Sequence, residues 1–127
     1  MPTGPGERGL EFVIKKGGNM KRIYVAGRLN DDAVGYLQNV SRMVKAALEI
    51  RKRGYSVFVP CLDLVMGIVD GNMSYEDYTA NNKAWVEVSD AVYVIPGSDG
   101  SRGTQEEIAL ALRLGIPVIR NIRDLER

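Results

Sequence analysis

Short apolar runs alternate with longer stretches of helical periodicity along most of this chain. Runs with the length and composition of buried strands occupy residues 22–26, 57–60, 91–95 and 117–119. Apolar residues recur at helical spacing in residues 32–53, 74–89 and 104–114. This order of elements, with its short connections, predicts an α/β fold with a mostly parallel sheet of about five strands and helices on both faces.

The helical segments carry recognisable end signals. Asp31 or Asp32 can cap the first helix, and Gly54 stands where a C-terminal glycine is expected. Ser74–Asp77 matches the capping-box spacing at the start of the second. The residues expected to face the core are Val34, Leu37, Val40, Val44, Ala47, Leu48 and Ile50 in the first helix and Tyr78, Trp85, Val86 and Val88 in the second.

Two segments are less regular. Residues 61–73 contain Gly67 and Gly71, and we expect a mobile or partly helical connection there. Residues 1–19 are rich in Gly and Pro and are expected to form an extension to a single domain over 20–127. Within the extension, 11–16 is compatible with either a short edge strand or a flexible leader.

The amino-acid composition argues against several classes of function. The 17 basic and 16 acidic side chains give a net charge of +1, which argues against a nucleic-acid polymer as partner. Every apolar run is much shorter than the ~18 residues of a membrane span, so we expect a cytoplasmic protein. Cys61 is the single cysteine, so no intrachain disulfide can form, and a buried thiol is expected. The absence of histidine removes the Ser-His and Cys-His routes to catalysis and the commonest zinc ligand, and we expect no metal or cofactor.

The junction after the third strand is the strongest candidate for a site. The strand ends at Pro96-Gly97, a glycine-rich loop follows, and a helix then begins. At the carboxyl end of a parallel strand, such a loop and helix N-terminus suit an anion such as phosphate. No lysine follows Gly103, so the Walker pattern of NTPases is not met. The candidate ligand-binding residues are Ser98, Gly100, Ser101, Arg102 and Gly103.

The end of the first strand offers a second candidate. Gly27 would let a ligand approach the backbone, and Arg28 can pair with a phosphate. A tight turn with a solvated arginine is the simpler interpretation. The dinucleotide pattern G-x-G-x-x-G is absent here.

Glu106 and Glu107 need to be distinguished. Adjacent helical residues differ by about 100° in direction, so both cannot face one site. Glu107 lies at the rim of the face that Ile108 and Leu112 turn to the core, whereas Glu106 is better placed for solvent and the helix dipole. Position alone leaves the choice open. Tyr75 and Tyr78 can either line a base pocket or serve packing.

Taken together, these segments resemble the nucleoside 2-deoxyribosyltransferase-like family, which includes 2'-deoxynucleoside 5'-phosphate N-hydrolases. The resemblance covers about residues 21–119. Its carriers are Ile23–Gly27, Gly54–Pro60, Trp85–Val92, Gly103–Ala111 and Gly115–Ile119. The family implies a Rossmann-like, flavodoxin-like three-layer sandwich that cleaves the N-glycosidic bond of a nucleoside or nucleotide. The loop also partly resembles the motif of lonely-guy-type phosphoribohydrolases.

The resemblance also implies roles for individual residues. The nucleophile that attacks C1' of the sugar maps onto Glu107, and Tyr24 corresponds to the tyrosine that orients it. A 5'-phosphate would be bound by Gly27, Arg28, Ser101 and Gly103, and Thr104 belongs to the same motif. Family members are oligomers, so a homodimer or larger assembly is expected.

This chain departs from the family pattern at one position that matters for catalysis. The family places an aspartate eight residues before Asp90, where it protonates or binds the leaving base, and this chain has Asn82. An amide can bind a base but cannot deliver a proton. Either Asp77 supplies the proton, the leaving group needs none, or the chain binds nucleotides without turnover. The leading prediction is cleavage of a nucleoside 5'-monophosphate, by hydrolysis or deoxyribosyl transfer. The alternatives are a nucleotide sensor and a partner subunit that keeps only the fold.

Overall fold

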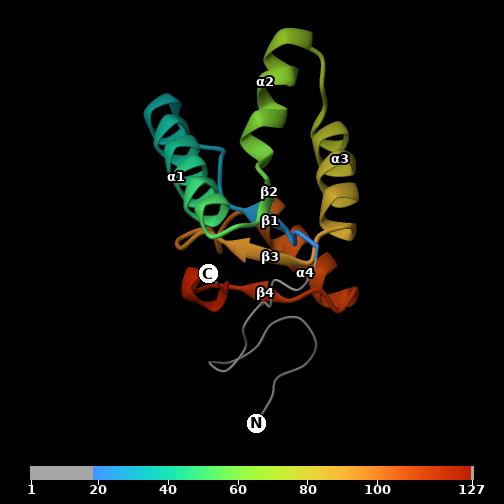
Figure 1. The fold of residues 1–127 in the computed structure, drawn as a ribbon. Helices are drawn as coiled ribbons and strands as arrows, with labels where there is room; N and C mark the ends of the chain where they lie inside the picture. The colour runs from blue at the N-terminus through green and yellow to red at the C-terminus, as the bar shows by residue number, and fades with distance from the viewer. Residues whose placement is uncertain (1–18, 127) are drawn as a thin grey trace.

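The computed structural model describes residues 19–126, which form a parallel sheet flanked by helices (Figure 1). The four strands of these residues lie in the order β2-β1-β3-β4 and pair in parallel throughout. The expected α/β fold is confirmed. Residues 11–16, the possible edge strand, lie outside the described residues. The elements are β1 (Arg22–Ala26), α1 (Ala33–Lys52), β2 (Ser56–Phe58), α2 (Pro60–Asp70), α3 (Tyr75–Glu87), β3 (Ala91–Val94), α4 (Arg102–Arg113), β4 (Val118–Ile119) and the 3-10 turn η1 (Ile122–Asp124).

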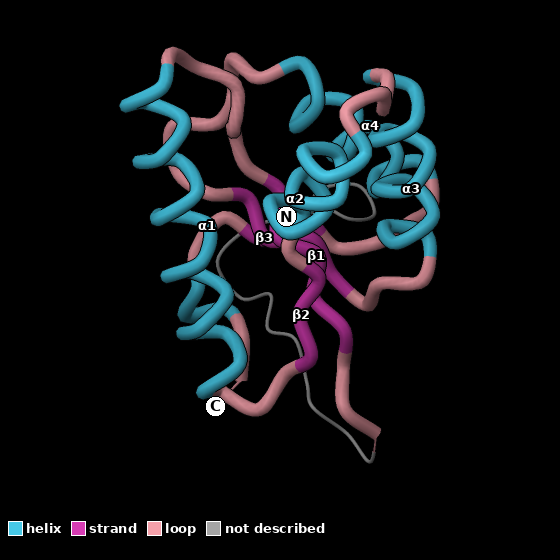
Figure 2. Tube along the Cα trace, turned by 90° about the horizontal axis from the view of Figure 1, so that it is seen from above, coloured by secondary structure: helices cyan, strands magenta, loops and turns pink. Residues whose placement is uncertain are grey.

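The sheet separates two cores because neighbouring strand residues point to opposite faces. Ile23 and Val25 pack with α1 and with Leu125 on one face. Tyr24 and Ala26 pack with Val86 of α3 and with residues of α4 on the other. Figure 2 shows α1 on one side of the strands and α3 and α4 on the other. The strand order changes direction between β1 and β3, and ligands of such sheets bind at the carboxyl ends of the strands at this point.

Helix α1 matches its predicted bounds to within one residue at each end. Its predicted buried face is confirmed only in part, because Ala47 and Ile50 are buried and Val40 packs against the core. The Asp32 carboxylate caps it by accepting from the Gly35 amide at 2.8 Å. The fully buried residues are Asn39, Met43, Ala47 and Ile50, whereas Val34, Leu37, Val44 and Leu48 are exposed. The helix carries two apolar stripes, and periodicity does not tell which one the sheet covers.

Residues 60–70 form an ordinary helix, so of the two alternatives for the connection at 61–73, the partly helical one is confirmed. Pro60 occupies the first turn of α2, where a missing N–H costs nothing. Gly71 ends the helix with φ of +80°, a conformation that favours glycine. Gly67 lies against the Tyr78 side chain of α3, with no room for a Cβ atom. Cys61 is buried, as expected.

Helix α3 begins with the predicted capping box, in which Ser74 and Asp77 bind each other's backbone amides. Val86 is buried, but Trp85 and Val88 are 43% and 51% exposed, so their predicted inward positions are wrong. Trp85 instead lays its ring on Phe58, and Phe58 stacks on Tyr24. Among the described residues, we find no helix with the length and apolarity needed to cross a membrane.

Candidate active site

The side chains of Tyr24 and Glu107 meet at the carboxyl side of the sheet. Tyr24 is fully buried in β1, and Glu107, in the second turn of α4, is 9% exposed. The Tyr24 hydroxyl donates to Glu107 Oε2 at 2.6 Å. This short charge-assisted bond fixes the carboxylate where the strands end.

Burial dominates the ionisation of both groups. It raises the pKa of Glu107 from 4.5 to about 7; the bonds from Tyr24 and Asn82 act against this shift, and the charge of Glu106 adds to it. Burial also raises the pKa of Tyr24 well above 10, and the nearby Glu107 carboxylate adds to the effect. Near neutral pH, Glu107 is therefore poised between its acid and its base form, while Tyr24 keeps its proton.

Glu106 points elsewhere and has different partners. Its Oε1 accepts from the Tyr75 hydroxyl at 2.8 Å, and its Oε2 lies 3.3 Å from Nε of Arg102. The Arg102 guanidinium also lies over the Tyr75 ring, 4.7 Å from its centre. The hydrogen bond from Tyr75 is the main reason why the pKa of Glu106 is lowered. The two glutamates thus diverge, with Glu107 directed to the strand ends.

Glu107 lines a cavity of about 280 Å³ between β1, α2, α3 and the start of α4. The other lining residues are Gly27, Leu29, Asn30, Pro60, Leu64, Tyr75, Tyr78, Asn82, Ser101, Gly103 and Thr104. A second space, of about 400 Å³, shares four of these residues. It adds Arg28, Gly100 and Arg102, so its mouth carries two guanidinium groups at a helix N-terminus.

Two unpartnered polar atoms of lining residues are buried at this cavity. They are Oδ1 of Asn82 and Oγ1 of Thr104. The Asn82 amide nitrogen donates its hydrogen bond to Glu107, so the amide oxygen of Asn82 remains available to accept from a ligand. Buried polar atoms normally have partners, so these two favour a ligand that carries hydrogen-bond donors.

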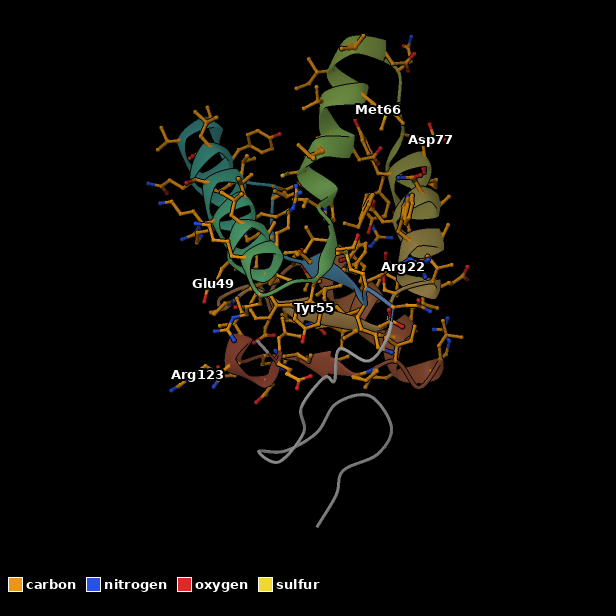
Figure 3. The ribbon with its side chains drawn as sticks, viewed as in Figure 1. Arg22, Glu49, Tyr55, Met66, Asp77 and Arg123 are labelled. Carbon is orange, nitrogen blue, oxygen red and sulfur yellow. The ribbon has the colours of Figure 1, made fainter. Side chains whose placement is uncertain are left out.

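Most residues predicted for the site line one of these two spaces. Tyr24 lies outside both linings but contacts the lining residue Glu107, whereas Asp77 and Ser98 lie elsewhere. The Asp77 carboxylate accepts from the Ser74 amide at 2.9 Å. It lies at the end of α3 that is remote from Arg22 and the sheet (Figure 3). Ser98 is buried, and its hydroxyl accepts from the Arg28 amide at 3.0 Å, so it joins the two loops instead of lining the cavity.

The sequence did not indicate the contribution of α2. Pro60 and Leu64 form part of the cavity wall. Asp63, in the first turn, is buried with one carboxylate oxygen unpartnered, and its charge contributes to the raised pKa of Tyr24. The signal that would have found this helix is the Pro60 start and Gly71 stop, which bracket an apolar run.

Comparisons with known proteins agree with this architecture. A solved structure of a 2-deoxyribosyltransferase from the psychrotolerant bacterium Bacillus psychrosaccharolyticus superposes with a TM-score of 0.55 and 22% identity, over 81% of this chain and 79% of that chain. At this identity the similarity establishes a shared fold. Among curated proteins, none matches significantly. The profile of a family described as a domain of unknown function, DUF4406, matches residues 21–120, and the chain therefore belongs to the DUF4406 family.

Proposed function

We propose that this protein cleaves the N-glycosidic bond of a nucleoside 5'-monophosphate, with Glu107 as the nucleophile. The observation that carries the proposal is a buried carboxylate held by Tyr24 in a cavity at the topological switch point of the sheet. The shared fold with a 2-deoxyribosyltransferase supports glycosyl chemistry on a nucleoside.

The chemistry proceeds by double displacement. An oxygen of ionised Glu107 bonds to C1' while the C1'–N bond breaks and its electron pair leaves with the base. Water, or a second base, then attacks C1' and releases the carboxylate, which completes hydrolysis or transfer. A carboxylate at this position also stabilises the oxocarbenium-like transition state. The Tyr24 hydroxyl keeps the attacking oxygen in place.

Asn82 replaces the acid that would protonate the leaving base. It lines the cavity and offers a free buried acceptor, so we assign it to base binding. Asp77 is committed to the helix cap and lies outside the cavity lining. The departing base must then take its proton from solvent, or leave with its charge stabilised by hydrogen bonds. This favours bases that are good leaving groups.

The 5'-phosphate is assigned to the second space, at the start of α4. Arg28 and Arg102 have side chains that are 50% and 76% exposed. Their ion pairs, with Asp31 at 3.9 Å and with Glu106 at 3.3 Å, are exposed and therefore weak enough for an anion to replace. Ser101 and Gly103 bring hydroxyl and backbone donors at the positive end of the helix dipole. A neutral nucleoside would leave these donors unused.

The second candidate is a nucleotide-binding module without turnover, and the amide at position 82 favours it. Incubation with a panel of ribo- and deoxyribonucleotides, followed by chromatography for free base, separates the two. Release that is abolished in Glu107→Ala and retained in Glu106→Ala supports the enzyme. Tight nucleotide binding with no release from any substrate assigns the chain to the sensor class.

A further inference from the structure

A third pocket lies on the α1 face of the sheet, opposite the Glu107 cavity. It is lined by residues of α1, of the loop before α1 and of the turn at 96–98 after β3, and we call it the α1 pocket. Figure 2 shows α1 on the other side of the strands from α3 and α4, which border the Glu107 cavity. The volume of the α1 pocket, about 120 Å³, is room for about four water molecules at roughly 30 Å³ each, and is below the ~300 Å³ of ordinary ligand pockets. The α1 pocket therefore suits a small group and is too small for a nucleoside.

The walls of the α1 pocket carry two guanidinium groups and one carboxylate, those of Arg28, Arg42 and Asp31. The Arg42 guanidinium donates to Oδ1 of Asn39 at 2.5 Å, and Asn39 in turn donates to the Leu29 carbonyl at 3.2 Å. Asn39 is only 4% exposed, so it is a fixed anchor for the Arg42 head group. Across residues 19–126, no carboxylate pairs with Arg42. The pocket thus has two positive charges against one negative charge, and one of its guanidinium groups lacks a counter-ion.

Arg28 is only weakly neutralised. Its Nη2 lies 3.9 Å from Oδ2 of Asp31, and the two side chains are 50% and 37% exposed, so this ion pair contributes little in water. Its Nε donates to the Asn30 carbonyl at 3.3 Å, which leaves most of its five N–H donors available. The Arg28 amide donates to the buried Ser98 hydroxyl at 3.0 Å, and this bond holds the loop after β1 against the turn after β3. The backbone of Arg28 is therefore fixed, while its exposed head group can turn toward an anion.

We propose that the α1 pocket is an oxyanion site that binds free phosphate between the guanidinium groups of Arg28 and Arg42. A guanidinium presents paired N–H donors that match two oxygens of a phosphate, and two such groups can divide the oxygens of one ion. The volume admits an ion of this size, and the excess of positive charge favours it over a neutral ligand. Asp31 opposes the anion, but its partly exposed side chain can turn toward solvent.

Arg28 connects this site with the space assigned to the nucleotide. It lines both the α1 pocket and the second space, whereas of these two Arg42 lines only the α1 pocket and Arg102 only the second space. A phosphate held by Arg28 and Arg42 therefore takes from the second space one of the two guanidinium groups assigned to the 5'-phosphate. Abundant phosphate should thus lower the affinity for a nucleotide, and this consequence alone rests on the proposed function.

The test is an NMR titration of the isotope-labelled full-length protein with inorganic phosphate at constant ionic strength. The amides of residues 39–42 and 97–98 should shift saturably with a single Kd. In Arg42→Gln this Kd should rise at least about tenfold, because a charged donor is lost, while any shift of the amides at 101–103 should keep its wild-type Kd. Lys45→Gln, which removes an exposed cation of α1 outside the pocket lining, is the matched control and should keep the wild-type Kd.

A second titration, with a nucleoside 5'-monophosphate, separates this site from the nucleotide site. The nucleotide should shift mainly the amides at 101–103, and added phosphate should weaken its binding more in the wild type than in Arg42→Gln. An equal effect of phosphate in both proteins overturns the sharing of Arg28. The proposal itself is overturned by the absence of saturable shifts at 39–42 with phosphate, by an unchanged Kd in Arg42→Gln, or by saturation of these amides with the nucleotide alone. The shifts are read without turnover, so a chain that releases no base leaves the phosphate titration decisive.

Discussion

The hydroxyl of Tyr24 donates a 2.6 Å hydrogen bond to Glu107, 83 residues away in the chain. One residue comes from the first strand and the other from the last long helix, and the reversal of strand order between β1 and β3 brings them together. The bond opposes the effect of burial on the carboxyl, whose pKa is still about 7.

Glu107→Gln should abolish base release, whereas Glu106→Gln should retain most of it. The first change removes the attacking oxygen from the cavity, for which we expect a loss of at least about 10³-fold in kcat. The second affects a carboxylate bound to Tyr75 and Arg102 at the rim. Single-turnover release of base by both variants is the measurement. Equal losses in the two would contradict the assignment of the nucleophile.

Activity should rise with pH through about 7 as Glu107 ionises. Tyr24→Phe removes a bond that lowers this pKa, so the acid limb of the kcat/KM profile should move to higher pH. The loss of one charge-assisted bond, worth ~1.5–3 kcal/mol, should also reduce the rate roughly 10–150-fold. An acid limb that stays in place would show that Tyr24 does not hold the carboxylate during catalysis.

Glu107 should destabilise the fold at neutral and higher pH. Its pKa is raised from 4.5 when unfolded to about 7 when folded, so the unfolded chain releases this proton first. The contribution of Glu107 to the free energy of unfolding is therefore most favourable below pH 4.5, falls as pH rises, and is least favourable above about pH 7. A difference of this size is on the order of 3 kcal/mol.

Urea unfolding of wild type and Glu107→Gln at pH 4.5 and pH 8 measures this effect. The variant should be more stable than the wild type at pH 8 by on the order of 2–3 kcal/mol, with little difference at pH 4.5. A variant that is less stable at pH 8 would mean that the carboxylate is better compensated than its burial indicates.

Much of the fold follows from the sequence because its signals are local. Asp32 and Ser74 cap the helices that follow them, as predicted, and the four apolar runs become the four strands of the described residues. The grouping of Glu107 with Tyr24 follows from the carboxyl-end rule together with the family pattern. These features depend on short-range chemistry or on parallel connectivity.

Which side chains are buried, and which helices reach the cavity, depend on tertiary packing, and the periodicity of the sequence does not determine that packing. Met43, and not Val44, faces the sheet from α1. Trp85 stacks on Phe58 and keeps 43% of its surface exposed. The contribution of α2 was missed because Gly67 and Gly71 made this segment look irregular, whereas Gly67 lies inside the helix and packs against Tyr78. Asp77 had two competing interpretations, and its cap to Ser74 prevails.

The phosphate assignment predicts a loss that is specific to nucleotides. Replacing Arg28 and Arg102 with Gln should raise KM for a nucleoside 5'-monophosphate roughly tenfold each, about 1.4 kcal/mol per contact. KM for the matching nucleoside should be unchanged. Steady-state kinetics on the matched nucleotide and nucleoside measure both KM values. An equal rise in KM for the two substrates would show that the 5'-phosphate does not bind these arginines.

The most direct test of Glu107 as the nucleophile is to look for a covalent sugar adduct on this protein while it is mixed with substrate. Wild-type protein is mixed with a deoxynucleoside 5'-monophosphate at pH 8, quenched with acid within milliseconds, digested and examined by mass spectrometry. Double displacement predicts a deoxyribose-phosphate adduct on the peptide that contains Glu107, and none in Glu107→Gln. Release of base by the wild type with no adduct at any time point, or undiminished release by Glu107→Gln, would contradict Glu107 as the nucleophile.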